Sequence, residues 1–376
     1  MNEPPQAPAF DPKGASAPKR AFALEPALAR LKGAKTALIY THDNPDPDSL
    51  AAAMGLQRLL EHELGVKVTI THGGIVGRAQ NRAMVETLKL PLVPAERVAA
   101  PLFDAIALVD SQPETGNNSL PLEHRIDIVV DHHPPRPGSA RAPWCDIRPE
   151  LGATSTIVFG YLRERHVPID AALATAVFFA LRTETRDLGR ESTEAERQVY
   201  LELVPLVDHA VLYRMTHPKV PSEHFAALDR ALRSAQVFGD LVAVNLGPLD
   251  YPDLVAEIAD LLLSYEDARY VLCMGQYEGS AYLSLRTEAT DARAGRVMRQ
   301  VVGTDGAAGG HGTMAGARLF APVVSDQALQ LTFLGMVQRL RDALGHEAVA
   351  GKPLLRAQAT RNAKTLSGRP RPPSGR

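Results

Sequence analysis

The spacing of apolar positions divides the first half of the chain into strand and helix segments. Short apolar runs that are typical of buried strands occupy residues 34–40, 66–70, 105–109 and 126–130. Helical periodicity is expected at residues 24–31, from about residue 49, at 81–88, 153–163, 171–181 and 194–206. This alternation predicts an α/β fold with a doubly wound, mostly parallel sheet and helices on its faces, over residues 21–207.

The second half of the chain predicts a helical connector and a smaller α/β domain. Residues 208–235 read as helical, with Pro218 and Pro221 interrupting the pattern. In the domain at 236–347, strands are expected at 237–246, 269–276 and 281–286, and helices at 254–263, 292–301 and 325–344. Residues 303–316 read as a glycine-rich loop. Residues 1–20 and the basic segment 356–376 are expected to be disordered tails.

Composition narrows the class of protein. The 376 residues are 45% hydrophobic and carry a formal net charge of -2, which does not favour a protein that coats nucleic acid. The chain has only two cysteines, Cys145 and Cys273, far apart in the sequence, which argues against a disulfide framework or a thiolate zinc site. Neither a membrane-spanning run nor a secretory signal is evident, so we expect a soluble cytoplasmic protein without membrane contact.

Acidic and imidazole side chains follow three of the predicted strands. They are His42, Asp46 and Asp48 after the first strand, Asp110 after the third, and Asp131, His132 and His133 after the fourth. In a parallel sheet of this kind, ligands bind beyond the carboxyl ends of the strands. The sequence therefore predicts a divalent-metal site at that edge.

The carboxylates suggest how two ions would be shared. Asp46 and Asp48 flank Pro47 on a tight turn and can diverge toward two neighbouring cations. The alternative is that Asp48 caps a helix that begins at Ser49. Asp110 is expected to bridge two metals, although a turn-forming aspartate is the simpler alternative when it is taken alone.

The segment Asp131-His132-His133 offers three different functions. Two adjacent histidines point in different directions, so one can bind metal while the other faces a substrate. Asp131 can hydrogen-bond a histidine and set its tautomer. Because the site is rich in oxygen and lacks thiolates, Mn²⁺ or Mg²⁺ suits it better than zinc.

A second candidate site lies in the smaller domain. Backbone amides of Gly309, Gly310 and Gly312 could cradle a phosphate, with His311 as an additional donor. Arg286 could add a bidentate phosphate contact. The alternatives are a flexible loop and an ordinary exposed arginine.

Together these motifs resemble the DHH phosphoesterases with a DHH-associated C-terminal domain, within the RecJ-like superfamily. The family takes its name from the motif seen here as Asp131-His132-His133. Its first motif appears at residues 42–49, its second at Val109-Asp110, and its C-terminal glycine motif at 309–316. The resemblance covers residues 35 to 319. The two-domain layout of the chain is similar to that of the nano-RNases that also dephosphorylate 3′-phosphoadenosine 5′-phosphate.

The resemblance implies a two-domain enzyme that uses two Mn²⁺ ions, with Mg²⁺ as an alternative. One ion would be bound by His42, Asp46 and Asp110, and the other by Asp48, Asp110, His132 and a carboxylate of a fourth motif. His133 would lie near the scissile phosphate, with Asp131 beside it.

Three positions depart from the family pattern. Pro47 stands where relatives often have glycine, and two glycines precede His311 where many relatives have three. In the fourth motif Glu184 replaces an aspartate, and Asp187 is a rival ligand.

The expected function is hydrolysis of a phosphoester in short oligonucleotides or small nucleotides, by two-metal activation of water. The alternatives are a non-catalytic nucleotide-binding regulatory protein and a single-strand-specific exonuclease. The expected partner is the oligonucleotide or nucleotide substrate, and a homodimer is left open.

Overall fold

The computed structural model describes residues 24–355, except residues 122, 290–291, 323–324 and 348. The two predicted tails, residues 1–20 and 356–376, lie outside the described residues. The chain divides into two compact units, Met1–Lys219 and Val220–Arg376. The predicted connector divides between them, because α7 (His209–Thr216) packs on α3 and α5 of the first unit and α8 (Ser222–Ser234) packs on β8 of the second.

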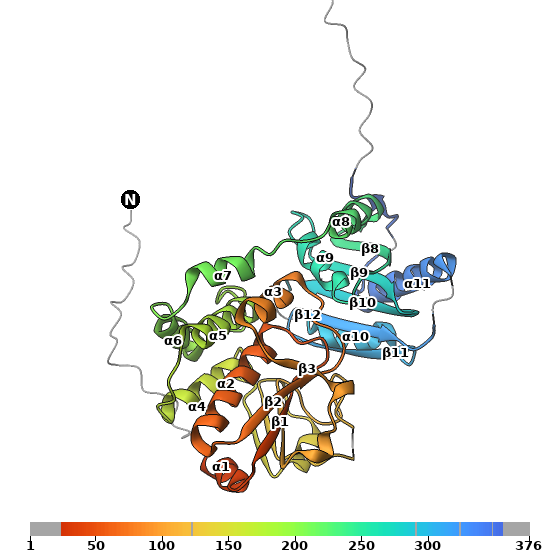
Figure 1. The fold of residues 1–376 in the computed structure, drawn as a ribbon. Helices are drawn as coiled ribbons and strands as arrows, with labels where there is room; N and C mark the ends of the chain where they lie inside the picture. The colour runs from red at the N-terminus through yellow and green to blue at the C-terminus, as the bar shows by residue number, and fades with distance from the viewer. Residues whose placement is uncertain (1–23, 122, 290–291, 323–324, 348, 356–376) are drawn as a thin grey trace, which may run out of the picture. The chain divides into compact units, whose positions relative to one another are not determined.

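The first unit contains a six-stranded parallel sheet in the order β3-β2-β1-β4-β5-β6. Figure 1 labels β1, β2 and β3 of this sheet. The strands are β1 (Thr36–Tyr40), β2 (Lys67–His72), β3 (Leu92–Pro94), β4 (Ala105–Val109), β5 (Ile128–Asp131) and β6 (Trp144–Ile147). The four predicted strands are present, and the mostly parallel sheet is confirmed. The pattern missed β3 and β6, which are short and lack fully buried positions.

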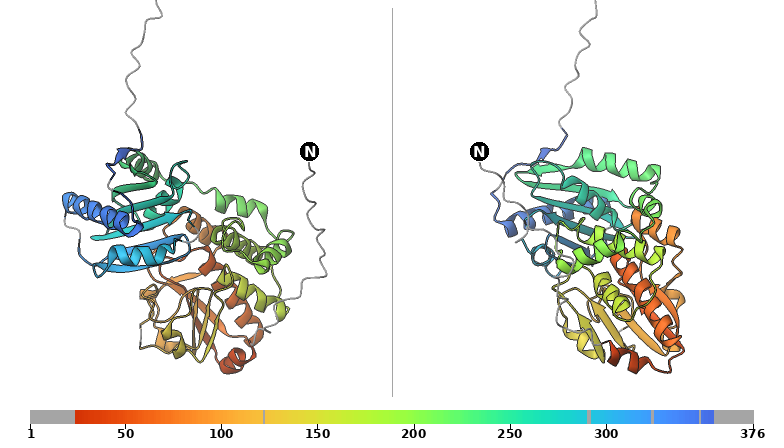
Figure 2. Two further views of the ribbon diagram at one scale, coloured as in Figure 1. Left: turned by 180° about the vertical axis from the view of Figure 1, so that it is seen from behind. Right: turned by 90° about the vertical axis from the view of Figure 1, so that its left-hand side faces the viewer.

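Helices of the first unit pack over one face of this sheet. They are α1 (Glu25–Leu31), α2 (Pro47–Leu64), α3 (Ala79–Leu88), α4 (Thr154–Glu164), α5 (Ala171–Glu184), α6 (Glu194–Leu203) and α7. A single core cluster joins their apolar side chains to alternate strand positions such as Ile39 and Val130. Helices α2, α4 and α5 lie side by side in this layer (Figures 1 and 2).

The other face of the sheet is covered by short 3₁₀ turns in place of α-helices. The turns are Ala95–Arg97, Ala100–Leu102 and Pro137–Arg141. Around Leu38 and Leu108 on this face, side chains from the connecting segments form a smaller core. The chain crosses to this face between β3 and β4, where the strand order reverses, so the topological switch point lies between β1 and β4.

The second unit contains a seven-stranded mixed sheet in the order β11-β12-β10-β9-β8-β7-β13. The strands are β7 (Gln236–Phe238), β8 (Leu241–Pro248), β9 (Tyr270–Tyr277), β10 (Ser280–Thr287), β11 (Gly306–His311), β12 (Met314–Leu319) and β13 (Lys352–Pro353). The helices are α8, α9 (Leu254–Leu262), α10 (Ala294–Val302) and α11 (Asp326–Leu344).

The strand-like residues predicted at 237–246 form two antiparallel strands, β7 and β8, because the chain turns at Gly239, whose φ is 69°. One local prediction in this unit was wrong. The expected glycine-rich loop is the antiparallel hairpin of β11 and β12, in which Gly309 pairs with Gly316 and Gly310 with Ala315. Small residues suppressed the strand pattern there without preventing the backbone from pairing.

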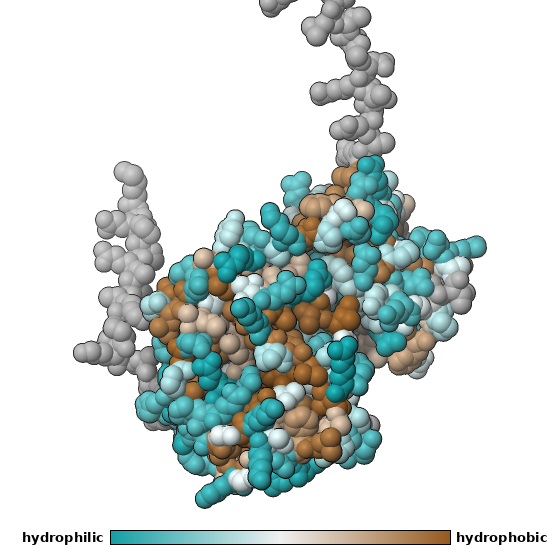
Figure 3. Space-filling view, in the orientation of Figure 1, coloured by the Kyte–Doolittle hydropathy of each residue, from teal (hydrophilic) through white to brown (hydrophobic). Residues whose placement is uncertain are grey.

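The visible surface mixes polar and apolar residues (Figure 3). Large exposed apolar side chains include Leu102, Tyr213 and Phe320. Within the described ranges, none of the helices is both long enough and apolar enough to cross a membrane.

Candidate metal centre

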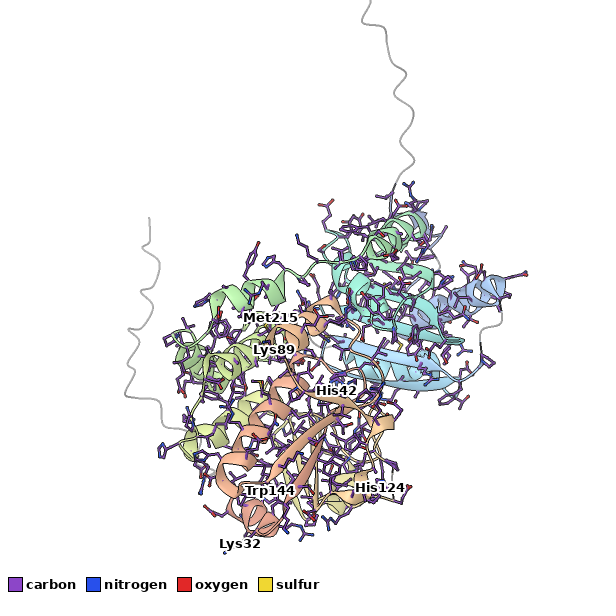
Figure 4. The ribbon with its side chains drawn as sticks, viewed as in Figure 1. Lys32, His42, Lys89, His124, Trp144 and Met215 are labelled. Atoms are coloured by element: carbon purple, nitrogen blue, oxygen red, sulfur yellow. The ribbon has the colours of Figure 1, made fainter. Side chains whose placement is uncertain are left out.

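Neighbouring strands bring the predicted residues of the first unit to one edge of its sheet. Strands β1, β4 and β5 are adjacent and parallel, so the segments that follow them leave the sheet at the same edge. Figure 4 marks His42 just beyond the end of β1, whereas Trp144, the first residue of β6, lies toward the opposite edge. The site is therefore assembled at the switch point of the sheet, as the strand ends predicted.

The beginning of α2 fixes the first pair of carboxylates. Asp46 is the N-cap, since its Oδ1 accepts a hydrogen bond of 3.0 Å from the amide of Ser49, whose hydroxyl lies 3.1 Å from the amide of Asp46. The helix begins at Pro47, earlier than predicted, and Asp48 lies in its first turn. The alternative that Asp48 caps this helix is therefore wrong, and Asp46 has that function.

Asp110 lies between two histidines. Its Oδ2 is 3.6 Å from Nε2 of His42, and its Oδ1 is 3.6 Å from Nε2 of His132. Nε2 of His42 is also 3.5 Å from Oδ1 of Asp46. Each carboxylate oxygen of Asp110 thus faces a different imidazole, which is the arrangement expected of a bridging ligand.

These residues form two groups whose potential ligand atoms lie within 4.8 Å of one another. The groups are His42 with Asp46 and Asp110, and Asp110 with His132 and His133. The backbone of Asp110 has a φ of 55°, a left-handed conformation that aspartate and asparagine tolerate better than most residues.

Backbone carbonyls set the tautomers of the two histidines. Nδ1 of His42 is 2.9 Å from the carbonyl oxygen of Asp43, and Nδ1 of His132 is 3.2 Å from that of Leu151. Because a carbonyl oxygen only accepts hydrogen bonds, Nδ1 carries the proton in each ring. In the neutral ring Nε2 then presents a lone pair toward Asp110, which is the form that binds metal.

Asp48 is held by the N-terminus of α4. Its Oδ2 accepts from the amide of Thr154 at 2.7 Å, and its Oδ1 accepts from the amide of Ser155 at 2.9 Å. The hydroxyl of Thr154 donates to Oδ1 of Asp110 at 2.8 Å. Asp48 belongs to neither group of potential ligand atoms above, so its role as a ligand stays a prediction.

The two candidates for the fourth motif lie in different surroundings. Glu184 is the last residue of α5 and is close enough to raise the pKa of both Asp48 and His132. Asp187 has a side chain that is 61% exposed and pairs with Arg182. The structure therefore favours Glu184 over Asp187 as the residue that faces the centre.

Buried like charges dominate the electrostatics. Burial raises the pKa of Asp110 well above its usual range, and Asp48 and Asp46 raise it further. Burial also raises the pKa of Asp48 to about 6, although His132 opposes this rise. Burial lowers the pKa of His42, but Asp46 and Asp110 outweigh it and raise that pKa to about 10. The site thus concentrates negative charge where a positive charge would relieve it.

His133, whose Nδ1 lies 3.7 Å from Oδ1 of Asp110, is also paired with the buried Asp131. Oδ1 of Asp131 is 2.9 Å from Nδ1 of His133, and Oδ2 accepts from Nε2 of Gln112 at 2.6 Å. Burial raises the pKa of Asp131, but the hydrogen bond from His133 outweighs it and the pKa is lowered. Sequence reasoning missed Gln112, although its position two residues after Asp110 was a usable signal.

The second unit places its predicted residues in regular strands. Arg286 lies in β10, and its Nε donates to Oδ1 of Asp260 at 2.8 Å. Its side chain is only 7% exposed, so it is not the ordinary exposed arginine of the alternative. Register puts Arg286 opposite Met314 of β12, beside the turn at Gly312.

The glycines of the hairpin have different surroundings. A Cβ on Gly310 would lie 2.3 Å from the carbonyl oxygen of Met314 and 2.5 Å from Cα of Ala315, whereas a Cβ on Gly309 would contact nothing within 4 Å. Gly312 has a φ of 42° in the turn. The side chain of His311 lies outside the part of the chain that the structure describes, so its predicted role is untested.

Known proteins that are similar to this chain include one from an archaeon and one from a bacterium. An uncharacterized protein of Methanocaldococcus jannaschii is 30% identical over 299 residues, covering 78% of this chain and 60% of the relative. A probable manganese-dependent inorganic pyrophosphatase of Enterococcus faecalis is 29% identical over 149 residues, covering 39% of this chain and 47% of the relative. The chain therefore spans between about half and three fifths of the length of these relatives.

One solved structure shares the fold over most of the chain. An exopolyphosphatase-related protein from Bacteroides fragilis superposes with a TM-score of 0.67 at 15% identity, covering 85% of this chain and 98% of that one. Residues 36–181 match the family model described as the DHH family, N-terminal domain. These residues include the strand ends β1, β4 and β5 that build the centre, and the chain thus carries the N-terminal domain of the DHH family, as its motifs predicted.

Proposed function

We propose that this protein is a phosphoesterase that depends on divalent metal ions and uses two Mn²⁺. The observation that carries the proposal is the position of Asp110, whose two carboxylate oxygens each face the Nε2 of a different histidine at 3.6 Å. Two-metal hydrolases place a shared oxygen ligand between ions about 3.5–4 Å apart. Among the described residues, Asp110 belongs to both groups of potential ligands and fits that requirement.

The donor set fits hard divalent ions. Carboxylate oxygens outnumber imidazoles, thiolates are absent from the described groups, and the buried carboxylates raise one another's pKa. His42, Asp46 and Asp110 would hold one ion, and Asp110, His132, Asp48 and Glu184 the other. Ions bound there would polarise phosphoryl oxygens and lower the pKa of water.

His133 would act on the substrate. Its side chain is 36% exposed, and Asp131 orients its ring through Nδ1. A ring held in this way would contact a phosphoryl oxygen through Nε2, or hold a proton for the leaving oxygen. Asp131 would then be a positioning residue, because its carboxylate is already engaged by His133 and Gln112.

The proposed substrate is a short oligonucleotide or a small nucleotide such as 3′-phosphoadenosine 5′-phosphate. Arg286, Gly309, Gly310, His311 and Gly312 would bind its distal phosphate or its base. The pairing of Arg286 with Asp260 supports a preset orientation of the guanidinium, and its position beside the hairpin turn supports a shared subsite.

A second candidate is hydrolysis of a phosphoanhydride. It is favoured by relatives that are described as a probable manganese-dependent inorganic pyrophosphatase and an exopolyphosphatase-related protein. Phosphoanhydrides and phosphoesters require the same stabilisation of charge at phosphorus, so the centre of the first unit suits both.

The test is turnover of a substrate panel by the full chain with Mn²⁺. The panel contains short RNAs, 3′-phosphoadenosine 5′-phosphate, cyclic dinucleotides, pyrophosphate, polyphosphate and long single-stranded DNA. The proposal expects the fastest turnover on the short RNAs or the nucleotide, and loss of that turnover with EDTA. Preference for pyrophosphate or polyphosphate would support the second candidate, and progressive digestion of long DNA would indicate an exonuclease.

Binding without turnover would indicate a regulatory protein. If calorimetry detects Mn²⁺ and nucleotide binding but no member of the panel is hydrolysed, the proposed phosphoesterase is wrong. Asp110→Asn is the matched control, since an activity that this substitution leaves unchanged comes from a contaminant or from another site.

A further inference from the structure

Gln112 is a buried amide that connects the segment after β4 to the segment after β5. It lies two residues beyond Asp110 and is 1% exposed. Its neighbours come from Asp131 and from the turn that includes Pro137–Arg141.

The nitrogen of this side-chain amide faces hydrogen-bond acceptors, and its oxygen faces donors. Nε2 donates to Oδ2 of Asp131 at 2.6 Å and lies 3.2 Å from the carbonyl oxygen of Pro134. Oε1 accepts from the amide of Arg136 and from the hydroxyl of Ser139, both at 2.7 Å. A carbonyl oxygen only accepts and a backbone amide only donates, so these partners fix which end of the amide faces Asp131.

Asp131 carries the contact onward to His133. Its Oδ1 is 2.9 Å from Nδ1 of His133 and accepts from the backbone amide of His133 at 3.2 Å. Asp131 is 1% exposed, whereas the side chain of His133 is 36% exposed. Hydrogen bonds therefore run from a fully buried amide to a ring at the rim of the centre.

We propose that Gln112 is a positioning residue for His133 and acts through Asp131. By donating to Oδ2, Gln112 fixes the rotation of the Asp131 carboxylate, so that Oδ1 stays aligned with Nδ1 of His133. The ring then keeps the tautomer and the angle that direct Nε2 to a phosphoryl group. The inference rests on the proposed function, in which His133 contacts the substrate.

The competing interpretation is that Gln112 only stabilises the turn at 134–139. Gln112→Glu separates the two interpretations, because it keeps an acceptor for Arg136 and Ser139 but removes the donor that faces Asp131. Ser139→Ala is the matched control, since it removes a contact of 2.7 Å from the other end of the same amide. Both variants are made in the full chain and assayed with Mn²⁺ on the best substrate of the panel.

Gln112→Glu is expected to lower kcat by about 10- to 100-fold, the usual effect of losing a hydrogen bond to a charged group. KM should stay within roughly threefold, because the substrate contacts themselves remain. Ser139→Ala should change kcat by less than roughly threefold. In an Asp131→Asn background, Gln112→Glu should cause little further loss, since both changes break the same connection.

Equal losses in Gln112→Glu and Ser139→Ala, or independent losses in the double variant, would overturn the proposal. If Gln112→Glu does not fold, Gln112→Met replaces it. Because methionine removes the acceptor as well as the donor, only the loss of kcat beyond that of Ser139→Ala is then assigned to the donor.

A second readout does not depend on turnover. Nitrogen chemical shifts of the His133 ring, assigned with His133→Asn in the Mg²⁺-loaded protein, report its tautomer. Gln112→Glu and Asp131→Asn should shift these signals, and Ser139→Ala should not. A shifted ring in a protein that hydrolyses nothing would mean that the proposed function fails while the positioning role holds. An unshifted ring would mean that the positioning role fails, whatever the activity.

Discussion

We predicted ligand binding at two places, the carboxyl edge of the first sheet and the glycine hairpin of the second unit. The two places are built differently. At the first site, the buried carboxylates of Asp110 and Asp48 lie close enough to the partly exposed Asp46 that its charge helps to raise the pKa of both. In the hairpin, close packing explains why residue 310 is a glycine, and Asp260 neutralises the charge of Arg286. Buried carboxylates that repel one another are unfavourable unless a cation binds, so they are strong evidence for a ligand. A segment that packs well by itself is weaker evidence for a ligand.

The largest effect is expected at Asp110, where this contrast is sharpest. Asp110→Asn keeps the left-handed backbone but removes the shared carboxylate, so kcat should fall by roughly 10³-fold, equivalent to several kcal/mol. Without metal, the variant should be at least as stable as the parent, because a buried repelling carboxylate is gone. Steady-state kinetics test the expected loss of kcat, and thermal unfolding in EDTA tests the expected stability without metal. Full activity in Asp110→Asn would show that the carboxylate of Asp110 is not needed, and the first site would then be no better supported than the hairpin.

Metal binding should stabilise the two units unequally. A 100-fold excess of Mn²⁺ over its Kd should stabilise the folded first unit by about 2.7 kcal/mol, which raises Tm by roughly 5–10 °C. The expected cause is relief of repulsion among Asp46, Asp48 and Asp110. Hydrogen exchange with diamagnetic Mg²⁺ should show new protection near residues 42–48 and 110–112. Protection confined to residues 306–319 would reverse the comparison.

A smaller effect is expected at Thr154, which supports Asp110 without facing an ion. Thr154→Val removes the hydroxyl that donates to Asp110 at 2.8 Å but preserves side-chain shape. Loss of such a supporting contact should weaken Mn²⁺ binding by about 10- to 100-fold in calorimetry. Thr154→Ser keeps the hydroxyl and should stay close to the parent. If both variants bind Mn²⁺ like the parent, the contact does not contribute to the centre.

The smallest effect tests the packing role of the hairpin. Gly310→Ala would place a Cβ 2.3 Å from a carbonyl oxygen at a φ of 143°, so it should destabilise the second unit by about 1–3 kcal/mol. Gly309→Ala is the matched control, because its Cβ would meet nothing within 4 Å. Chemical denaturation of both variants measures the difference. Equal stability would show that packing does not explain Gly310, whereas a raised KM in Gly309→Ala would support a binding role for the hairpin.

Much of the first unit could be predicted because its strands are buried on both faces. Strands β1, β4 and β5 read as continuous apolar runs, and the groups that follow them were therefore placed correctly at one edge. The sequence could not reveal that Asp46 rather than Asp48 caps α2, because the pattern did not show that the helix begins as early as Pro47. It also could not reveal the partners of Gln112, which lie 19 to 27 residues away in the chain.

The second unit was harder to predict because its strands are paired on a mixed sheet. β11 contains glycine, alanine and histidine, so it carries no alternating pattern and was expected to be a loop. Pairing with β12, which is specified by the rest of the sheet, overrides that local preference. The ion pair of Arg286 with Asp260 joins residues that are 26 apart, a separation that local patterns do not encode.

The two outer strands of the second sheet differ in how readily they would accept another strand. At one edge β13 is only Lys352–Pro353, and proline lacks the N–H group that strand addition requires. At the other edge β11 has six residues and no such block. Aggregation through sheet extension would therefore begin at β11, and Ala307, which is exposed there, is the position at which an engineered lysine should improve solubility.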